Sequence, residues 1–121
     1  MAELATSSIF ADLPEGMRIV DALRKWANNQ PEVIKVIIYG SRARGDQRED
    51  SDLDVAVELT NTSTGDVPFA IWLDEADSWH RELQPFIPWR LHLEWHDVEG
   101  ATPLVSEKIH RGCYIAYEEC A

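Results

Sequence analysis

The segment Val33–Tyr39 (VIKVIIY) constrains the fold most, because it is almost entirely apolar and rich in β-branched residues. Such a run is typical of a strand that is buried on both faces of a sheet. Gly40-Ser41 ends the run abruptly, and a polar stretch follows. A second run, Leu53–Thr60 (LDVAVELT), alternates apolar and polar residues and predicts another strand.

The rest of the chain alternates helical and strand patterns. Residues 14–29 have apolar side chains at helical spacing and end before Pro31, and residues 89–96 alternate as a strand does. A helix is expected from an N-cap at Asp66 to about residue 84, another over 102–111, and a short strand over 114–117. The predicted fold class is α/β (α+β) in the order α-β-β-α-β-α(-β), a small mixed sheet with helices packed on one face.

Length indicates one domain, residues 1–121, with 1–12 expected to be a loosely ordered N-terminal segment. The apolar side chains of the helix over 66–84 are expected to share one face, and the tryptophans among them to pack in the core together with Trp26. That apolar set is Phe69, Trp72, Leu73, Ala76, Trp79 and Leu83.

Charge excludes one class of function. The chain has 22 acidic and 11 basic residues and a net charge of −11, which argues against direct binding of nucleic acid. No apolar run is long enough to span a membrane, and the first residues lack the pattern of an export signal, so we expect a cytoplasmic protein. Cys113 and Cys120 are expected to be free thiols.

Gly40-Ser41 and the residues after it have the composition of a phosphate-binding turn. A glycine lets the backbone approach a ligand closely, and the Ser41 hydroxyl and the following N–H groups can donate to phosphate oxygens. Arg42 and Arg44 add positive charge beside them in an otherwise acidic chain.

Asp52 and Asp54 occupy alternate positions at the start of the second strand, so both carboxylates lie on one face. Two carboxylates a few ångströms apart repel each other unless a cation lies between them. Oxygen ligands suit Mg²⁺ or Mn²⁺ better than zinc. A phosphate-binding turn beside a carboxylate metal site indicates nucleotide chemistry.

Glu94 is the best candidate for a third carboxylate, because it lies in mid-strand on the polar face of residues 89–96. His92 and His96 share that face, so a zinc site formed with Glu94 is an alternative. His80 and His110 are expected on polar helix faces.

Gly40-Ser41, ten further residues and then Asp52-Leu53-Asp54 resemble the signature of the minimal nucleotidyltransferases of the DNA polymerase β-like superfamily. The segments VIIYGSRARG, LHLEWHD and EKIHRGCYIAYE also resemble this family. The resemblance implies a polymerase β-like fold and transfer of a nucleoside monophosphate, here AMP from ATP, to a hydroxyl with release of pyrophosphate.

The resemblance also assigns roles to residues. Two Mg²⁺ or Mn²⁺ ions would be held by the catalytic residues Asp52, Asp54 and Glu94. The triphosphate would be bound by Gly40, Ser41, Arg42, Arg44 and Ser51, with Arg44 the better of the two arginines. The third acidic residue is often aspartate in such proteins, and if His92 occupied its level in the sheet, the third carboxylate would be missing.

Many such proteins act with a HEPN-domain ribonuclease, as antitoxins that add AMP to a tyrosine of the toxin. The chain length leaves little room for an acceptor-binding domain, so we expect a protein adenylyltransferase that acts on a HEPN partner. Two alternatives remain: a nucleotidyltransferase for a small molecule such as an aminoglycoside, and a non-catalytic antitoxin that masks its partner.

Overall fold

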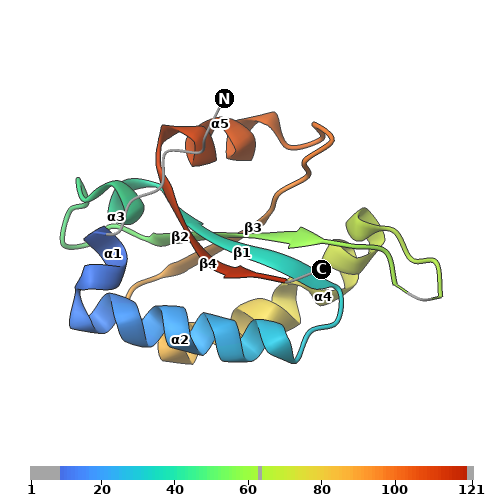
Figure 1. Cartoon of the computed structure of the whole chain (residues 1–121), viewed down its shortest axis with the longest axis horizontal. Helices are drawn as coiled ribbons and strands as arrows, with labels where there is room; N and C mark the ends of the chain where they lie inside the picture. Colours follow the sequence, from blue (N-terminus) through green and yellow to red (C-terminus); the bar gives the residue numbers. More distant parts are fainter. Residues whose placement is uncertain (1–8, 63, 120–121) are drawn as a thin grey trace.

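A four-stranded mixed sheet forms the centre of the computed structural model, which describes residues 9–62 and 64–119 (Figure 1). Its strands are β1 (Val33–Tyr39), β2 (Leu53–Leu59), β3 (Leu91–Trp95) and β4 (Cys113–Glu118), in the spatial order β3-β2-β1-β4. Strand β1 pairs antiparallel with both β2 and β4, whereas β2 pairs parallel with β3. Strand β3 is therefore an edge strand.

Helices cover both faces of the sheet. They are α1 (Ile9–Asp12), α2 (Pro14–Asn28), the short α3 (Ser41–Arg44), α4 (Pro68–Leu83) and α5 (Pro103–Arg111), with a 3₁₀ turn η1 (Gln84–Phe86). Helices α2 and α4 lie on one side of the sheet, and α5 lies on the other (Figure 1). The prediction of a small mixed sheet with helices is confirmed, but the prediction that all helices pack on one face is wrong.

The two faces have cores of very different size. The main core joins α2 and α4 to the side chains of β1 and β2 that point toward them, such as Val36 and Val55. The α5 side has a small cluster, in which Ile109 packs on the opposite side chains of the sheet. That cluster is Ile37, Tyr39, Ala56, Ile109 and Cys113. Alternation along each strand explains both, because neighbouring residues point to opposite faces.

Helix α4 differs from its predicted form in two respects. Its N-cap is Val67, which makes no side-chain cap, and Asp66 instead donates its backbone N–H to the Thr62 hydroxyl at 2.8 Å. Phe69 and Leu73 are 54% and 65% exposed, so the predicted apolar face is only partly buried. The reason is that α4 packs on β3, which is at the edge of the sheet. An edge strand covers less of a helix surface than the middle of a sheet does.

The tryptophans and cysteines mostly follow prediction. Trp79 is buried, and Trp26 and Trp72 pack against the main core with ring centroids 5.5 Å and 6.5 Å from that of Trp79. Cys113 is buried and free, whereas Cys120 lies outside the described residues. Among the helices of the described part, none has the length and apolar character that crossing a membrane requires.

Residues 1–12 are expected to be loosely ordered, and residues 1–8 of this segment lie outside the described residues. Residues 9–12 depart from that expectation. They form the helical turn α1, and Phe10 is 2% exposed, with its ring packed edge-on against Trp89 at 6.4 Å. An apolar contact of this kind holds the turn against the main core.

Candidate active site

Gly40 links the buried strand β1 to the short helix α3. Its φ of +77° lies in the left-handed region, which glycine adopts without strain. A β-carbon at this position would collide with the carboxylate of Asp54. The turn therefore packs directly against Asp54, one of the candidate metal ligands. The glycine is needed for both its conformation and its small size.

Helix α3 begins at Ser41, as the phosphate-binding prediction requires. Its only turn is closed by bonds from the N–H groups of Arg44 to Gly40 O (3.1 Å) and of Gly45 to Ser41 O (2.9 Å). The N–H groups of the first residues of a helix precede its internal bonds and can donate to a ligand. The Arg44 side chain is about one third exposed and pairs with Asp46 at 3.2 Å, a surface contact that a phosphate could replace.

The Arg42 side chain, unlike that of Arg44, is buried rather than exposed beside the turn. It is 7% exposed, and its guanidinium lies 3.6 Å from the ring centroid of Trp89. It donates to the carbonyl oxygens of Ser51 (2.9 Å), Glu49 (3.1 Å) and Arg48 (3.4 Å). Burial lowers the pKa of this guanidinium from its usual value. Arg42 thus holds the loop that leads to Asp52, and of the two arginines only Arg44 faces solvent beside the turn.

Ser51 also serves that loop. Its hydroxyl accepts the backbone N–H of Arg48 at 2.8 Å, and its own N–H donates to the Arg48 carbonyl at 3.1 Å. Asp52 follows directly, and β2 begins one residue later. The phosphate-binding roles predicted for Arg42 and Ser51 therefore stay predictions, while their contacts indicate that they shape the loop.

Asp54 occupies the centre of the site. It pairs with Tyr39 of β1 on one side and with His92 of β3 on the other. Its Oδ1 lies 3.0 Å from His92 Nδ1, and its side chain is 24% exposed. Asp52 precedes it by two positions, directly before β2 begins.

Glu94 lies one step further along β3, level with Ala56. His92 therefore occupies the level of Asp54, the register that the sequence left open. The third carboxylate contacts this histidine, because His92 Nε2 lies 2.8 Å from Glu94 Oε1. The His92 ring bridges Asp54 and Glu94, and its side chain is 48% exposed.

The donor set fits a hard divalent cation. Asp52, Asp54 and Glu94 offer only carboxylate oxygens, which suit Mg²⁺, and the register places Asp54 and Glu94 on the face on which the Gly40 turn approaches. In the part of the chain that the structure describes, no three such side chains are already arranged around a common metal position. His92 lies between two of the carboxylates, so a cation held by both requires its side chain to turn toward solvent.

Tyr39 is a site residue that the sequence analysis missed. Its side chain is 1% exposed on the same face as Asp54, its partner in the sheet. Burial, with smaller effects from the negative charges of Asp54 and Glu94, raises the pKa of its hydroxyl above the usual range. The phenol thus stays neutral beside the carboxylates. Its position directly before Gly40 is the signal that could have identified it.

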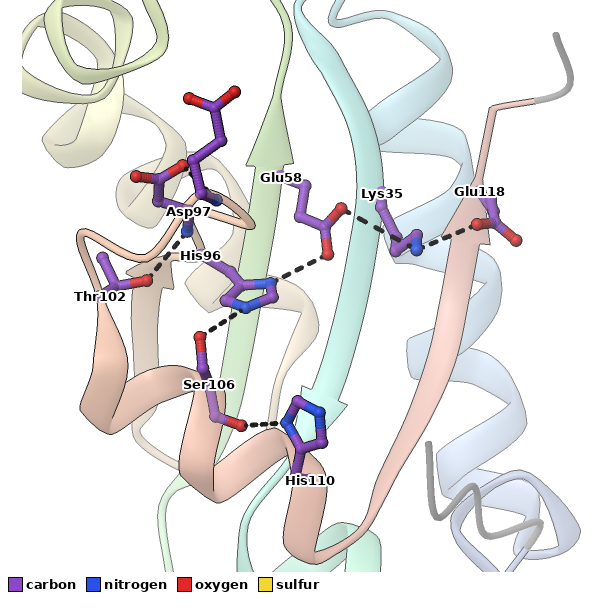
Figure 2. Close-up of polar contacts among 9 residues, drawn as sticks. Lys35, Glu58, His96, Asp97, Thr102, Ser106, His110 and Glu118 are labelled. Atoms are coloured by element: carbon purple, nitrogen blue, oxygen red, sulfur yellow. Dashed lines mark hydrogen bonds and ion pairs between the residues drawn. The ribbon is translucent and has the colours of Figure 1, made fainter. Parts of the chain in front are cut away.

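A second polar cluster lies on the same face of the sheet, at the other end of β3 (Figure 2). His96 Nδ1 lies 2.9 Å from Glu58 Oε2, and His96 Nε2 lies 2.9 Å from the hydroxyl of Ser106 in α5. Lys35 extends the cluster, 3.9 Å from Glu58 and 3.0 Å from Glu118. His92 and His96 thus contact different groups, which argues against the zinc alternative.

The order serine, histidine and glutamate resembles a nucleophilic triad, but the helix around Ser106 does not support that role. The N–H of Ser106 already donates to the carbonyl of Thr102 at 3.0 Å within α5. A hydroxyl nucleophile needs free backbone or side-chain donors beside it to stabilise an oxyanion. The Glu58–His96–Ser106 cluster instead ties α5 to the sheet.

The remaining histidines lie on helices, as expected. His80 Nε2 lies 2.9 Å from the carbonyl oxygen of Leu91, and His110 Nδ1 lies 2.7 Å from the carbonyl oxygen of Ser106. Neither contacts the carboxylates described above.

Comparison with known proteins agrees with this geometry. A family model described as polymerase beta, nucleotidyltransferase, matches residues 21–87, which span β1, the Gly40 turn, both aspartates and α4. No curated protein matches the chain. A solved structure described as the crystal structure of the toxin-antitoxin with AMP-PNP is similar in fold, with a TM-score of 0.53 and 20% identity. That match covers 88% of this chain and 75% of the other. Because the family model matches more than half of the chain, the protein belongs to the polymerase beta nucleotidyltransferase family.

Proposed function

We propose that this nucleotidyltransferase transfers AMP from ATP to a hydroxyl of a partner protein and acts as an antitoxin. The observation that carries the proposal is the packing of the Gly40 turn against Asp54, with Glu94 linked to Asp54 through His92. A turn that can bind phosphates thus stands beside carboxylates that can hold a divalent cation. Nucleotidyl transfer needs these two parts in contact.

In this proposal, different residues bind the triphosphate and the divalent cation. The Ser41 hydroxyl and the first N–H groups of α3 would donate to the triphosphate, and Arg44 would leave Asp46 to pair with it. Asp52, Asp54 and Glu94 would hold Mg²⁺, which when bound neutralises phosphate charge and makes the acceptor hydroxyl more acidic. Tyr39, neutral and buried, would add no negative charge at the point where the triphosphate binds.

Glu94 is the residue best placed to take the proton from the acceptor. Its side chain is 38% exposed, so an incoming hydroxyl can reach it. As the acceptor oxygen forms a bond to the α-phosphorus, the bond from that phosphorus to the bridging α–β oxygen breaks. Pyrophosphate leaves, and the acceptor proton passes to the Glu94 carboxylate.

Two observations support a protein acceptor and an adenine nucleotide. The similar solved structure is a toxin-antitoxin with AMP-PNP. The sequence segments around Gly40, Asp52 and Glu94 also resemble minimal nucleotidyltransferases that act with HEPN ribonucleases. We therefore take the acceptor to be a tyrosine of a HEPN-family toxin.

Radiolabelled ATP provides the test. The protein is incubated with Mg²⁺, α-labelled ATP and a candidate HEPN-domain toxin, and the label is located by mass spectrometry. Label on a tyrosine, with loss of ribonuclease activity, is the expected result. The proposal fails if the wild-type protein transfers no label and the Asp54→Asn variant neutralises the toxin equally well.

Masking without catalysis is a second candidate function. The bridging position of His92 favours it, because the ring occupies the space between Asp54 and Glu94 that a cation would need. A double variant, Asp52→Asn with Asp54→Asn, separates the two functions. A masking antitoxin would still protect cells from the toxin with both carboxylates removed, and an enzyme would not.

A further inference from the structure

Among residues 9–62 and 64–119, strand β3 has a neighbouring strand on one side only, so its other edge is free. Its pairing with β2 uses the backbone of the even-numbered residues, as shown by the bonds from Leu53 N to Arg90 O and from His96 N to Val57 O, both 2.9 Å. In a parallel pair, the alternate residues direct their N–H and C=O groups to the other side. The backbone groups of Leu91, Leu93 and Trp95 therefore point away from the sheet.

Side chains cover the first part of this edge. The N–H of Leu91 donates to Gln84 Oε1 at 2.9 Å, and His80 Nε2 lies 2.9 Å from the carbonyl oxygen of Leu91. Gln84 Nε2 also donates to the carbonyl of Trp89 at 2.8 Å. Within the described residues, the outward N–H and C=O groups of Leu93 have no such partner. An unpaired strand edge of this kind can accept a strand from another chain.

A groove leads along this edge into the active site. It has a volume of about 620 Å³ and is lined by β3, by the end of α4 and by one of the candidate metal ligands. Its lining residues are Asp52, His80, Gln84, Arg90, Leu91, His92 and Leu93. A strand laid in the groove beside Leu93 would thus run past His92, which contacts both Asp54 and Glu94.

Charge indicates what kind of segment fits. Side chains of an added strand would alternate between the face of Glu94 and the face of Leu93, which belongs to the main core. The first face carries the carboxylates of Asp54 and Glu94, and the net charge of −11 on the whole chain outweighs the single arginine of the groove, Arg90. A second copy of the chain is disfavoured, because two molecules of net charge −11 repel each other.

We propose that the acceptor reaches the active site as an extended, basic segment of the partner protein that pairs with the free edge of β3 at Leu93. Lysine or arginine side chains of the segment face the carboxylates, apolar side chains face α4, and the acceptor hydroxyl lies among the charged set beside Glu94. This inference rests on the proposed function, since it takes the acceptor to be part of a protein.

A defined peptide tests the pairing. The probe is a fluorescent heptapeptide that alternates lysine or arginine with valine and has a central tyrosine, and its control is N-methylated at every backbone amide. Binding is measured by fluorescence anisotropy at physiological salt. We expect the N-methylated peptide to bind at least tenfold more weakly, because methylation removes the donors that a strand needs but leaves charge unchanged. Absence of binding, or equal binding of both peptides, overturns the inference.

A matched pair of variants tests the edge itself. Leu93→Pro and Leu93→Ala both remove the leucine side chain, but only proline removes the outward N–H. We expect Leu93→Pro to bind the peptide at least tenfold more weakly than Leu93→Ala, with Mg²⁺-ATP affinities within twofold of each other. Equal peptide binding by two folded variants overturns the inference, and if Leu93→Pro does not fold, the two peptides on the wild-type protein decide.

The outcome for docking is separable from the outcome for catalysis. Peptide binding through β3 without AMP transfer to the whole partner would end the proposed function and leave the docking edge standing. AMP transfer that is equal in Leu93→Pro and Leu93→Ala would overturn the docking edge and leave the proposed function standing. A wild-type dimer in sedimentation that Leu93→Pro abolishes would show that a second copy pairs with β3, and would overturn the partner segment.

Discussion

Two histidines four residues apart, His92 in β3 and His96 directly after its end, lie in similar polar settings but differ in exposure. His92 bridges Asp54 and Glu94 and is 48% exposed, whereas His96 bridges Glu58 and Ser106 and is 10% exposed. A polar group near water can exchange its partners at little cost, but a buried one cannot. The comparison indicates that the exposed contacts around His92 are suited to bind and release ligands. The buried contacts around His96 are suited to hold α5 on the sheet.

The largest difference in activity is expected between variants of Asp54, which contacts His92, and of Glu58, which contacts His96. Asp54→Asn should lower nucleotidyl transfer by roughly a thousandfold, because it removes a carboxylate that would hold the cation. Glu58→Gln should leave transfer within a few fold of wild type. Rates of AMP transfer to the partner protein check both variants. Similar losses in the two would break the comparison.

Stability should show the opposite order. His96→Leu leaves the buried Glu58 carboxylate without its closest partner and should lower the free energy of unfolding by about 3 kcal/mol. Ser106→Ala, which removes only the hydroxyl, should cost about 1 kcal/mol. Urea denaturation followed by circular dichroism measures both. A loss below 1 kcal/mol in His96→Leu would show that the buried cluster is not needed for the fold.

Gly40→Ala should affect activity more than stability. The left-handed φ of +77° and the collision with Asp54 displace the turn, and a displacement of about 1 Å can lower a rate about a hundredfold. Gly65→Ala is a matched control, because its φ is +95° but a β-carbon there meets no atom. Transfer rates and melting temperatures of the two variants separate backbone strain from the contact with Asp54.

The smallest effect concerns His92. His92→Ala should change the free energy of unfolding by less than about 1 kcal/mol, since its contacts are half exposed. It should also raise the stabilisation that Mg²⁺ provides, because the ring no longer occupies the space between the carboxylates. Melting temperatures with and without Mg²⁺ check this without an activity assay. An unchanged response to Mg²⁺ would place the cation elsewhere.

Local patterns in the sequence were enough to predict most elements. Val33–Tyr39 was predicted with its observed bounds, because an apolar run ended by glycine depends little on the rest of the chain. The helix ended by Gly112 was also predicted closely, from a proline near its start and a glycine after its end. The family was identified from Gly40-Ser41 and the two aspartates, whose spacing is a property of the sequence itself.

Contacts between distant segments could not be predicted in the same way. The position of Arg42 depends on Trp89, which lies 47 residues further along the chain but only 3.6 Å from the guanidinium. The exposure of Phe69 depends on α4 lying at the edge of the sheet. The bridging role of His92 depends on the register between β2 and β3, which no local pattern specifies.

The small cluster under α5 has a consequence for how the protein opens. Helix α5 rests on Ile109 and its few apolar neighbours, while α2 and α4 share the main core. Segments with few buried contacts unfold locally at lower free energy than the whole domain. Amide hydrogens of α5 should therefore exchange with solvent ahead of those in β1 and β2. Each such opening uncovers Tyr39 and the floor of the active site while the rest of the domain stays folded.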